Sequence, residues 1–160
     1  MKSKGDDRLN CPTANESAGS EPRWFQPLPA SVPVTVAQLQ QISPTALAYL
    51  GDAVYELYIR NHYLHPPKRS PTYHRLVVAQ VRAETQALHL RELTPVLNNT
   101  ELEIVRRGRN AATRRPRRVE PEIYQQATSL ETLIGYLYLT NPQRLTQLLQ
   151  ELKLEPSPET

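Results

Sequence analysis

Apolar residues recur at helical spacing through most of the chain. In residues 47–57 they follow one another at intervals of three, four and three, and residues 127–137 repeat these intervals. The two sets are Leu47, Leu50, Val54 and Leu57, and Ala127, Leu130, Ile134 and Leu137. Such spacing puts the apolar side chains on one face of a helix. We find no convincing alternation of apolar and polar residues, so the sequence predicts an all-α fold.

Capping and breaking residues indicate where these helices begin and end. Proline follows a capping side chain at Ser43 and again at Asn141, which is typical of a helix start. Residues 100–103 have the spacing of a capping box, and Gly108 is expected to end the short helix that follows. The predicted helices span residues 35–41, 44–64, 72–93, 100–108, 121–139 and 142–152.

The two ends of the chain differ in composition from the body. Residues 1–33 contain five prolines and two glycines with few aliphatic side chains, a composition that cannot offset the entropy of ordering. We therefore expect a disordered or loosely docked extension over residues 1–33, one folded domain over residues 34–153, and a short tail over residues 154–160.

Length and composition exclude several classes of protein. The 160 residues suit one domain, and the single cysteine, Cys11, excludes an intrachain disulfide framework and a cysteine-based zinc site. The longest apolar run, residues 133–139, is far too short to span a membrane, and no signal peptide is recognisable. We therefore expect a cytoplasmic protein.

The net charge of +3 conceals an uneven distribution. Residues 106–118 hold seven arginines and no acid, and without them the 19 basic residues fall to 12 against 16 acidic ones. Gly108 and Pro116 favour a loop here, and guanidinium groups pair well with phosphate oxygens. The segment predicts a loop that binds a phosphate-rich partner; the alternative is a solvated, flexible charged loop.

Two acidic residues stand inside apolar helical sequence, each near a glycine. Asp52 follows Gly51, and Gly135 lies one turn after Glu131 on the same helical face. Glycine in a helix interior costs about 1 kcal/mol relative to alanine, so its presence suggests close helix packing or a site. Two helices packed through these glycines would bring the two carboxylates together.

Converging carboxylates without a basic partner repel one another unless a cation lies between them, and hard oxygen ligands suit Mg²⁺. Glu56, one turn after Asp52, is a weaker candidate for the same cluster. The alternative interpretation is that each acid caps a neighbouring helix or pairs with an arginine. The spacing of His62 and His65 is also compatible with a metal, but proline follows and no third ligand is evident.

Three ordered motifs resemble the catalytic domain of the ribonuclease III family. They are Ala48-Tyr-Leu-Gly-Asp-Ala-Val-Tyr-Glu56, Arg107-Gly-Arg-Asn-Ala111 and Glu131-Thr-Leu-Ile-Gly-Tyr-Leu-Tyr-Leu139. The resemblance covers roughly residues 36–150 and is closer to the compact Mini-ribonuclease III branch, which lacks a separate domain for binding double-stranded RNA.

This resemblance implies a homodimeric endoribonuclease that cleaves double-stranded RNA with Mg²⁺, using Asp52 and Glu131 as catalytic residues and metal ligands. It also implies maturation of the 23S ribosomal RNA precursor, with ribosomal proteins as possible partners. Full-length ribonuclease III has two further acids, where this chain has Ala48 and Thr128, as Mini-III enzymes do. The expected RNA-binding residues are Arg106, Arg107, Arg109, Asn110, Arg114, Arg115, Arg117 and Arg118, within a basic loop over residues 106–120.

Two other functions are compatible with the sequence. One is a non-catalytic RNA-binding or ribosome-associated protein that keeps the fold without the activity. The other is an all-α interaction module whose basic loop binds a different polyanion. The presence of both Asp52 and Glu131 argues against the first, and the resemblance to ribonuclease III argues against the second.

Overall fold

A computed structural model describes residues 33–113 and 118–156. Within these residues the chain forms helices and no strand, which confirms the predicted all-α fold. The elements are α1 (Val36–Gln41), α2 (Pro44–Leu64), α3 (Ser70–Val81), α4 (Ala83–Leu93), the 3₁₀ helix η2 (Thr94–Val96), α5 (Asn99–Ala111), α6 (Pro121–Thr140) and α7 (Pro142–Gln150). Among them, none has both the length and the apolar character needed to cross a bilayer.

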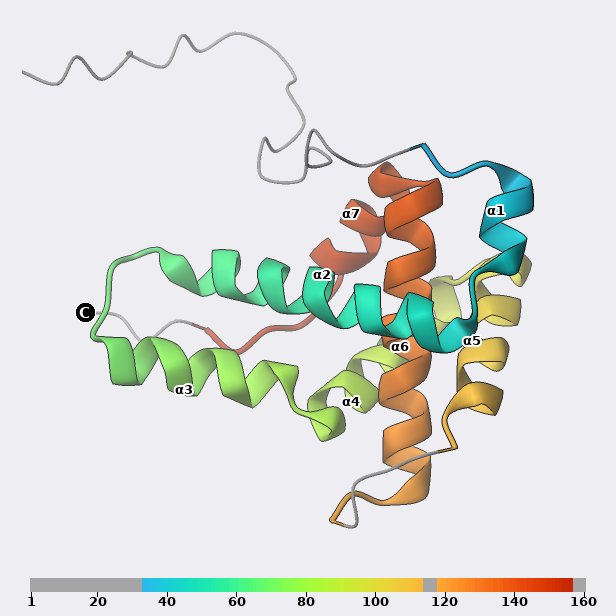
Figure 1. The fold of residues 1–160 in the computed structure, drawn as a ribbon. Coiled ribbons are helices and arrows are strands. Elements are labelled where there is room, and N and C mark those ends of the chain that lie inside the picture. Colours follow the sequence, from blue (N-terminus) through green and yellow to red (C-terminus); the bar gives the residue numbers. More distant parts are fainter. Residues whose placement is uncertain (1–32, 114–117, 157–160) are drawn as a thin grey trace, which may run out of the picture.

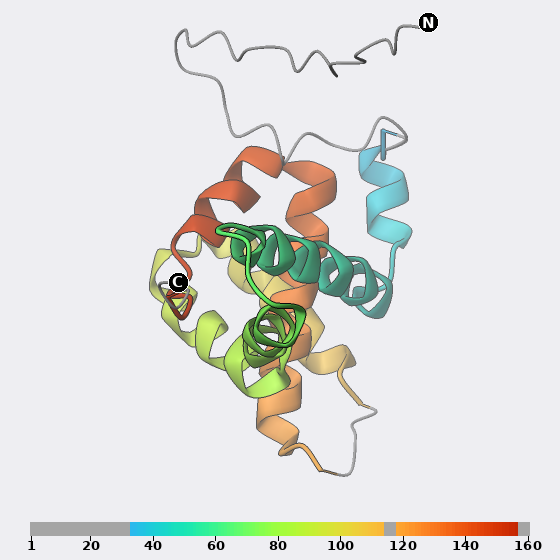
Figure 2. The ribbon, with the colours of Figure 1, turned by 90° about the vertical axis from the view of Figure 1, so that its left-hand side faces the viewer.

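Helix α6 is the centre of the fold. Helices α2, α4 and α5 all pack against it, and α7 folds back on its C-terminal end. Figure 1 shows α2 crossing in front of α6 with α5 to the right of α6, while α3 runs back alongside α2. The view turned by 90° shows α1 set apart from this bundle, and no side chain of α1 is buried (Figure 2).

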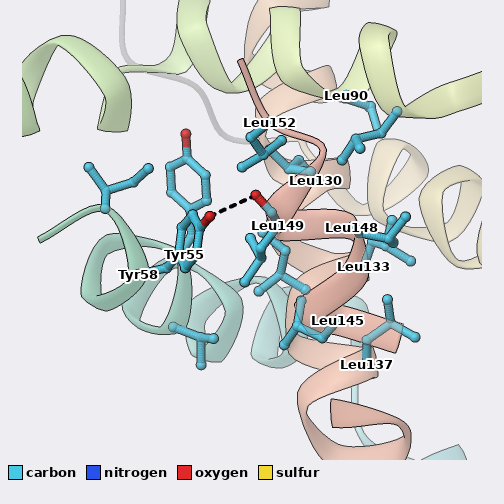
Figure 3. Packing of buried hydrophobic residues seen from close by; sticks show 14 of the residues in the cluster. Tyr55, Tyr58, Leu90, Leu130, Leu133, Leu137, Leu145, Leu148, Leu149 and Leu152 are labelled. Carbon is cyan, nitrogen blue, oxygen red and sulfur yellow. Dashed lines mark hydrogen bonds between the residues drawn. The ribbon is translucent and has the colours of Figure 1, made fainter. Parts of the chain in front are cut away.

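The core lies where α2, α4, α6 and α7 meet. Leucines of α6 and α7 interdigitate there with tyrosines of α2 (Figure 3). Burial of a tyrosine requires a partner for its hydroxyl, and Tyr58 donates to the backbone oxygen of Leu149 at 2.9 Å. Tyr63 donates to the backbone oxygen of Glu155 at 2.8 Å, which holds the segment after α7 against α2.

The predicted helix starts at Ser43 and Asn141 are confirmed. The Ser43 hydroxyl accepts a hydrogen bond from the backbone NH of Ala46 at 3.1 Å, and the Asn141 side chain accepts one from Arg144 at 3.0 Å. Thr35 caps α1 in the same way. These ends are local, because each is made by side chains within three residues of the helix start.

The prediction of one long helix over residues 72–93 was wrong. The backbone is extended at Arg82, which separates α3 from α4. Hydrogen bonds across the break replace the missing helical ones, since the Thr85 hydroxyl donates to the Ala79 oxygen at 2.7 Å. The Gln86 side-chain amide likewise donates to the Val81 oxygen at 3.0 Å. Neither glycine nor proline marks the break, so the sequence pattern did not show it.

The predicted bounds of the helix over residues 100–108 were also wrong. The capping box is made by Asn98 and Glu101, so α5 begins earlier, and the helix continues through Gly108 to Ala111. The first part of the arginine segment is consequently helical rather than a loop. Arg114, Arg115 and Arg117 lie outside the described residues, as do residues 1–32 and 157–160, so the expected N-terminal extension and most of the tail stay predictions.

Candidate active site

Helices α2 and α6 touch backbone to backbone at two glycines. A Cβ added to Gly51 would lie 1.8 Å from the backbone oxygen of Glu131, and one added to Gly135 would lie 2.0 Å from that of Leu47. No side chain fits in either place. The prediction that these glycines serve close helix packing is therefore confirmed.

Gly108 brings α5 onto a neighbouring face of α6. A Cβ there would meet the Thr132 side chain at 2.6 Å and the Cα of Ser129 at 3.0 Å. This contact explains why glycine is found inside α5 rather than at its end. Gly51 and Gly108 thus both contact residues 129–135 of α6, the segment that also contains Gly135.

The glycine crossing brings Asp52 and Glu131 into electrostatic contact. Burial raises the pKa of Glu131 to about 7, with a further rise from the charge of Asp52. Asp52 lies at the surface, and its pKa is raised by partial burial and then by the charge of Glu56. Two carboxyls that are 79 positions apart in the chain thus form one acidic site.

Among the described residues, neither acid has the alternative role considered from the sequence. Each helix cap is made by other residues, and no lysine or arginine forms an ion pair with Asp52 or Glu131. Glu56 lies near Asp52, but its carboxylate is engaged in an ion pair with Arg60. It is therefore a poorer candidate than the other two acids.

The donor set suits a magnesium ion better than a metal that needs a protein cage. In the described part of the chain there is no group of three or more acids, histidines or cysteines that could hold a metal ion through protein ligands alone. Ala48 and Thr128 are buried in the helix packing. Mg²⁺ commonly keeps several waters and takes one or two carboxylates together with a substrate phosphate, so Asp52 and Glu131 fit it.

Sequence reasoning missed Gln86, which the structure places beside Glu131. Gln86 is on α4 and only 2% exposed, and its amide donates to the Val81 backbone oxygen at 3.0 Å. Interaction with the Gln86 side chain lowers the pKa of the Glu131 carboxyl. The signal was present in the sequence, because Gln86 precedes the buried stripe of Ala87, Leu90 and Leu93.

The predicted RNA-binding residues within the described chain differ in their surroundings. Arg106 is engaged by Glu103, with Nε to Oε2 at 2.8 Å, and Arg107 is half-buried. Arg109 and Asn110 are exposed and line a cavity of about 550 Å³ with Tyr124 at the α5–α6 junction. Arg118 is also exposed. The described part of the segment therefore presents only some of its arginines without an acidic partner.

The histidines do not form a metal site in the described chain. His62 is exposed and packs edge-on against Tyr63, with ring centroids 4.9 Å apart. His89 is buried, and its Nδ1 lies 2.9 Å from the Tyr55 hydroxyl, which also donates to the Gln80 backbone oxygen. Burial lowers the pKa of His89, so this ring is a neutral part of the core.

Comparison with known proteins agrees with this arrangement. Residues 45–142 match the family model of the ribonuclease III domain. A Mini-ribonuclease 3 of Synechocystis sp. strain PCC 6803 is 56% identical over 134 residues, covering 83% of this chain and 91% of the relative. One of Synechococcus sp. strain PCC 6301 is 57% identical over 126 residues, covering 79% and 91%.

A solved structure is also similar to this chain. A protein of Fusobacterium nucleatum superposes with a TM-score of 0.63 at 33% sequence identity, over 68% of this chain and 89% of that one. The matched family model covers both acids and the three glycines at the contacts of α2 and α5 with α6. The chain therefore belongs to the ribonuclease III family and is an endoribonuclease of that type.

Proposed function

We propose that this enzyme hydrolyses double-stranded RNA in a Mg²⁺-dependent reaction in which Asp52 and Glu131 are the catalytic carboxylates. The observation that carries the proposal is their convergence across the glycine crossing without a basic partner in the described chain. Ribonuclease III enzymes generally act on double-stranded RNA and use a divalent metal ion, which supports both parts.

The two carboxylates have different parts in this reaction. Asp52 is at the surface and meets the RNA side of the site, whereas Glu131 is half-buried and held by its surroundings. A bound Mg²⁺ would supply an activated water and neutralise charge that develops on the scissile phosphate. Asp52 and Glu131 would hold that ion, and the tight crossing of α2 and α6 keeps the distance between these two carboxylates constant.

The catalytic test uses three single substitutions in the full chain. Asp52→Asn and Glu131→Gln remove one charge each with little change of shape, and we expect both to abolish cleavage of a duplex RNA. Glu122→Gln, an exposed acid in the first turn of α6, is the matched control and should cleave normally. Each variant is assayed with Mg²⁺ and with EDTA. Full activity of either site variant would show that the catalytic assignment is wrong.

The RNA is held by the arginine segment over residues 106–120. Each phosphate contact contributes about 0.9 to the slope of log affinity against log salt concentration for a duplex. Replacing Arg114, Arg115, Arg117 and Arg118 by alanine should therefore weaken binding and reduce that slope by up to about 3.6. Arg91→Ala on α4 is the control. An unchanged slope would mean that the four arginines face solvent.

A symmetric homodimer would present one such site to each strand of a duplex. On α2, Tyr49, Ala53 and Leu57 form an exposed stripe at intervals of four residues, next to Asp52, and Tyr49 is 85% exposed. A stripe of this kind on a helix that is otherwise packed favours a second copy as its partner. Tyr49→Glu should give monomers in sedimentation, while Leu88→Glu on α4 should not.

The biological substrate we propose is the precursor of 23S ribosomal RNA, cut at its paired ends in the cytoplasm. The test is to incubate the enzyme with a precursor transcript whose ends are paired and to map the new ends by primer extension. A transcript with one strand of the stem mutated to prevent pairing should resist cleavage. Faster cleavage of precursor particles than of naked RNA would indicate assistance by ribosomal proteins.

A further inference from the structure

A cavity of about 550 Å³ opens between the last turn of α5 and the first turns of α6. We infer that it is a nucleobase site, which accepts one unpaired base of the RNA while the duplex is bound at the acidic site. Tyr124 provides the surface on which the base stacks, and the amides of Asn110 and Gln125 bond to its edge. This assignment rests on the proposed function, because the base belongs to the RNA that the enzyme cleaves.

The cavity lies just beyond the point where α5 and α6 come closest. At Gly108 the two helices leave no room for a side chain, since an added Cβ would lie 3.0 Å from the Cα of Ser129. About one turn further on, α5 ends at Ala111, and one turn before Ser129 stands Gln125. The space between these helix ends falls within the range of about 300–1,000 Å³ typical of small-ligand pockets, and one water needs only about 30 Å³.

The polar side chains around this cavity have no partner in the described chain. Five of the residues that line it have side chains that make no hydrogen bond or ion pair within residues 33–113 and 118–156: Arg109, Asn110, Thr113, Tyr124 and Gln125. The tyrosines of the core differ, since Tyr58 and Tyr63 each donate to a backbone oxygen. Polar groups that converge on a space without bonding to one another are available to a ligand.

The chemistry of the lining favours a nucleobase over a phosphate. A phosphate oxygen only accepts hydrogen bonds, and Arg109 is the single cation among the described residues that line the cavity. The amides of Asn110 and Gln125 each offer a donor and an acceptor, which is the pattern that matches the edge of a base. Tyr124 adds a half-buried aromatic ring, and stacking on such a ring increases affinity roughly 5- to 150-fold per base.

The base must be unpaired to enter this cavity. Side chains reach the faces and edges of RNA bases where nucleotides are unpaired, and aromatic rings then stack on them. Tyr124 stands seven residues before Glu131, so two helical turns, or about 10 Å, separate these residues on one face of α6. An unpaired nucleotide bound at Tyr124 therefore determines which phosphate of the duplex lies at the acidic site.

The experiment measures the binding of fluorescent RNA duplexes by anisotropy in EDTA, so that no metal-dependent cleavage occurs. One duplex is fully paired, and in the others a single unpaired adenosine is moved one position at a time along one strand. We expect the enzyme to bind one position of the adenosine most tightly. Tyr124→Leu should bind that duplex roughly 5- to 150-fold less tightly and the paired duplex equally well. The salt dependence should not change, because the ring carries no charge.

Three further variants make the result specific. Tyr124→Phe keeps the ring and should keep the preference, whereas Tyr73→Leu removes a half-buried tyrosine of α3 outside the cavity and should bind like the wild type. Asn110→Ala, at an exposed position near the end of α5, should reduce discrimination between adenosine and the other bases roughly 5- to 150-fold. If circular dichroism shows that Tyr124→Leu does not fold, Asn110→Ala provides the test.

Equal affinity of the wild-type enzyme for the paired duplex and for every interrupted one would overturn the inference. An equal loss for all duplexes in Tyr124→Leu would also overturn it, because this result would indicate a packing role. Binding of adenosine monophosphate without any preference among the duplexes would mean that the cavity takes a free nucleotide instead. The two proposals fail separately: an active Asp52→Asn enzyme would refute the proposed function, whereas an inactive one without a preferred duplex would refute only the nucleobase site.

Discussion

The glycine crossing of α2 and α6 gives a stability prediction whose size follows from the structure. In Gly51→Ala the new Cβ would lie 1.8 Å from the backbone oxygen of Glu131 and 2.8 Å from the nitrogen of Gly135. Both obstacles are main chain inside a helix, so no side-chain rotation relieves them. Restoring an ordinary carbon–oxygen distance of about 3.3 Å requires the helices to separate by about 1.5 Å.

Two opposing effects determine how much Gly51→Ala changes the free energy of unfolding. Alanine in place of glycine favours the helix by about 1 kcal/mol, whereas overpacking a core costs typically 1–3 kcal/mol and sometimes more. Because the clash here is between backbones at the central helix contact, we expect a cost of about 4 kcal/mol, above the usual range, and hence a net loss of about 3 kcal/mol in the free energy of unfolding. The separation also displaces Asp52 from Glu131, and a misplacement of about 1 Å in an active site is enough to reduce activity about 100-fold.

The assay is urea unfolding followed by circular dichroism, with cleavage of duplex RNA measured where each variant is fully folded. Gly108→Ala is the graded control, since its nearest obstacle is the Thr132 hydroxyl at 2.6 Å rather than backbone, and its loss should be smaller. The double variant of Gly51 and Gly135 should lose less than the sum of its singles, because the first alanine already separates the helices. A stable, fully active Gly51→Ala enzyme would refute this reasoning.

Three further predictions follow from other parts of the structure. The pKa of Glu131 is about 7 in the folded protein against 4.5 unfolded, so the free energy of unfolding in EDTA should fall by about 3 kcal/mol as pH rises from 4.5 through 7. Glu131→Gln should flatten that pH dependence in urea titrations, and an unchanged slope in this variant would contradict the prediction. Arg144→Met leaves the Glu101 carboxylate, whose side chain is 3% exposed, without its ion-pair partner and should cost about 3–5 kcal/mol in thermal unfolding. The exposed pair of Arg106 and Glu103 is the control, and Arg106→Met should cost less than about 1 kcal/mol. Deleting residues 1–33 should leave the rate of duplex cleavage unchanged, and a large loss would place part of the catalytic domain in that extension.

Much of the local structure followed from short-range chemistry that is visible in the sequence. The starts of α2 and α7 depend on Ser43 and Asn141, whose side chains bond to backbone within three residues. The apolar intervals in α2 and α6 likewise depend only on helical geometry. Both acids stood out because a charge inside an apolar stripe contradicts the pattern around it.

Other features were decided by contacts between distant segments. The extended backbone at Arg82 and the continuation of α5 through Gly108 carry no local signal strong enough to reveal them. Gly108 resembles a helix stop until Thr132 and Ser129 of α6 are seen to occupy the space where a side chain would be. At Gly108 long-range packing overrides helix propensity, because the energy gained at the contact with α6 exceeds the local cost of about 1 kcal/mol.

By itself, the sequence determined the helical class, the capped helix starts, the two acids and the arginine segment, all of which depend on residue type and spacing within a few turns. Only the tertiary structure decided that Gly51 and Gly135 meet backbone to backbone and that the carboxyls of Asp52 and Glu131 share one site. It also placed Gln86 against that site. The physical reason is that helical periodicity specifies which side chains share a face, whereas the partner of that face depends on packing between segments that lie far apart in the chain.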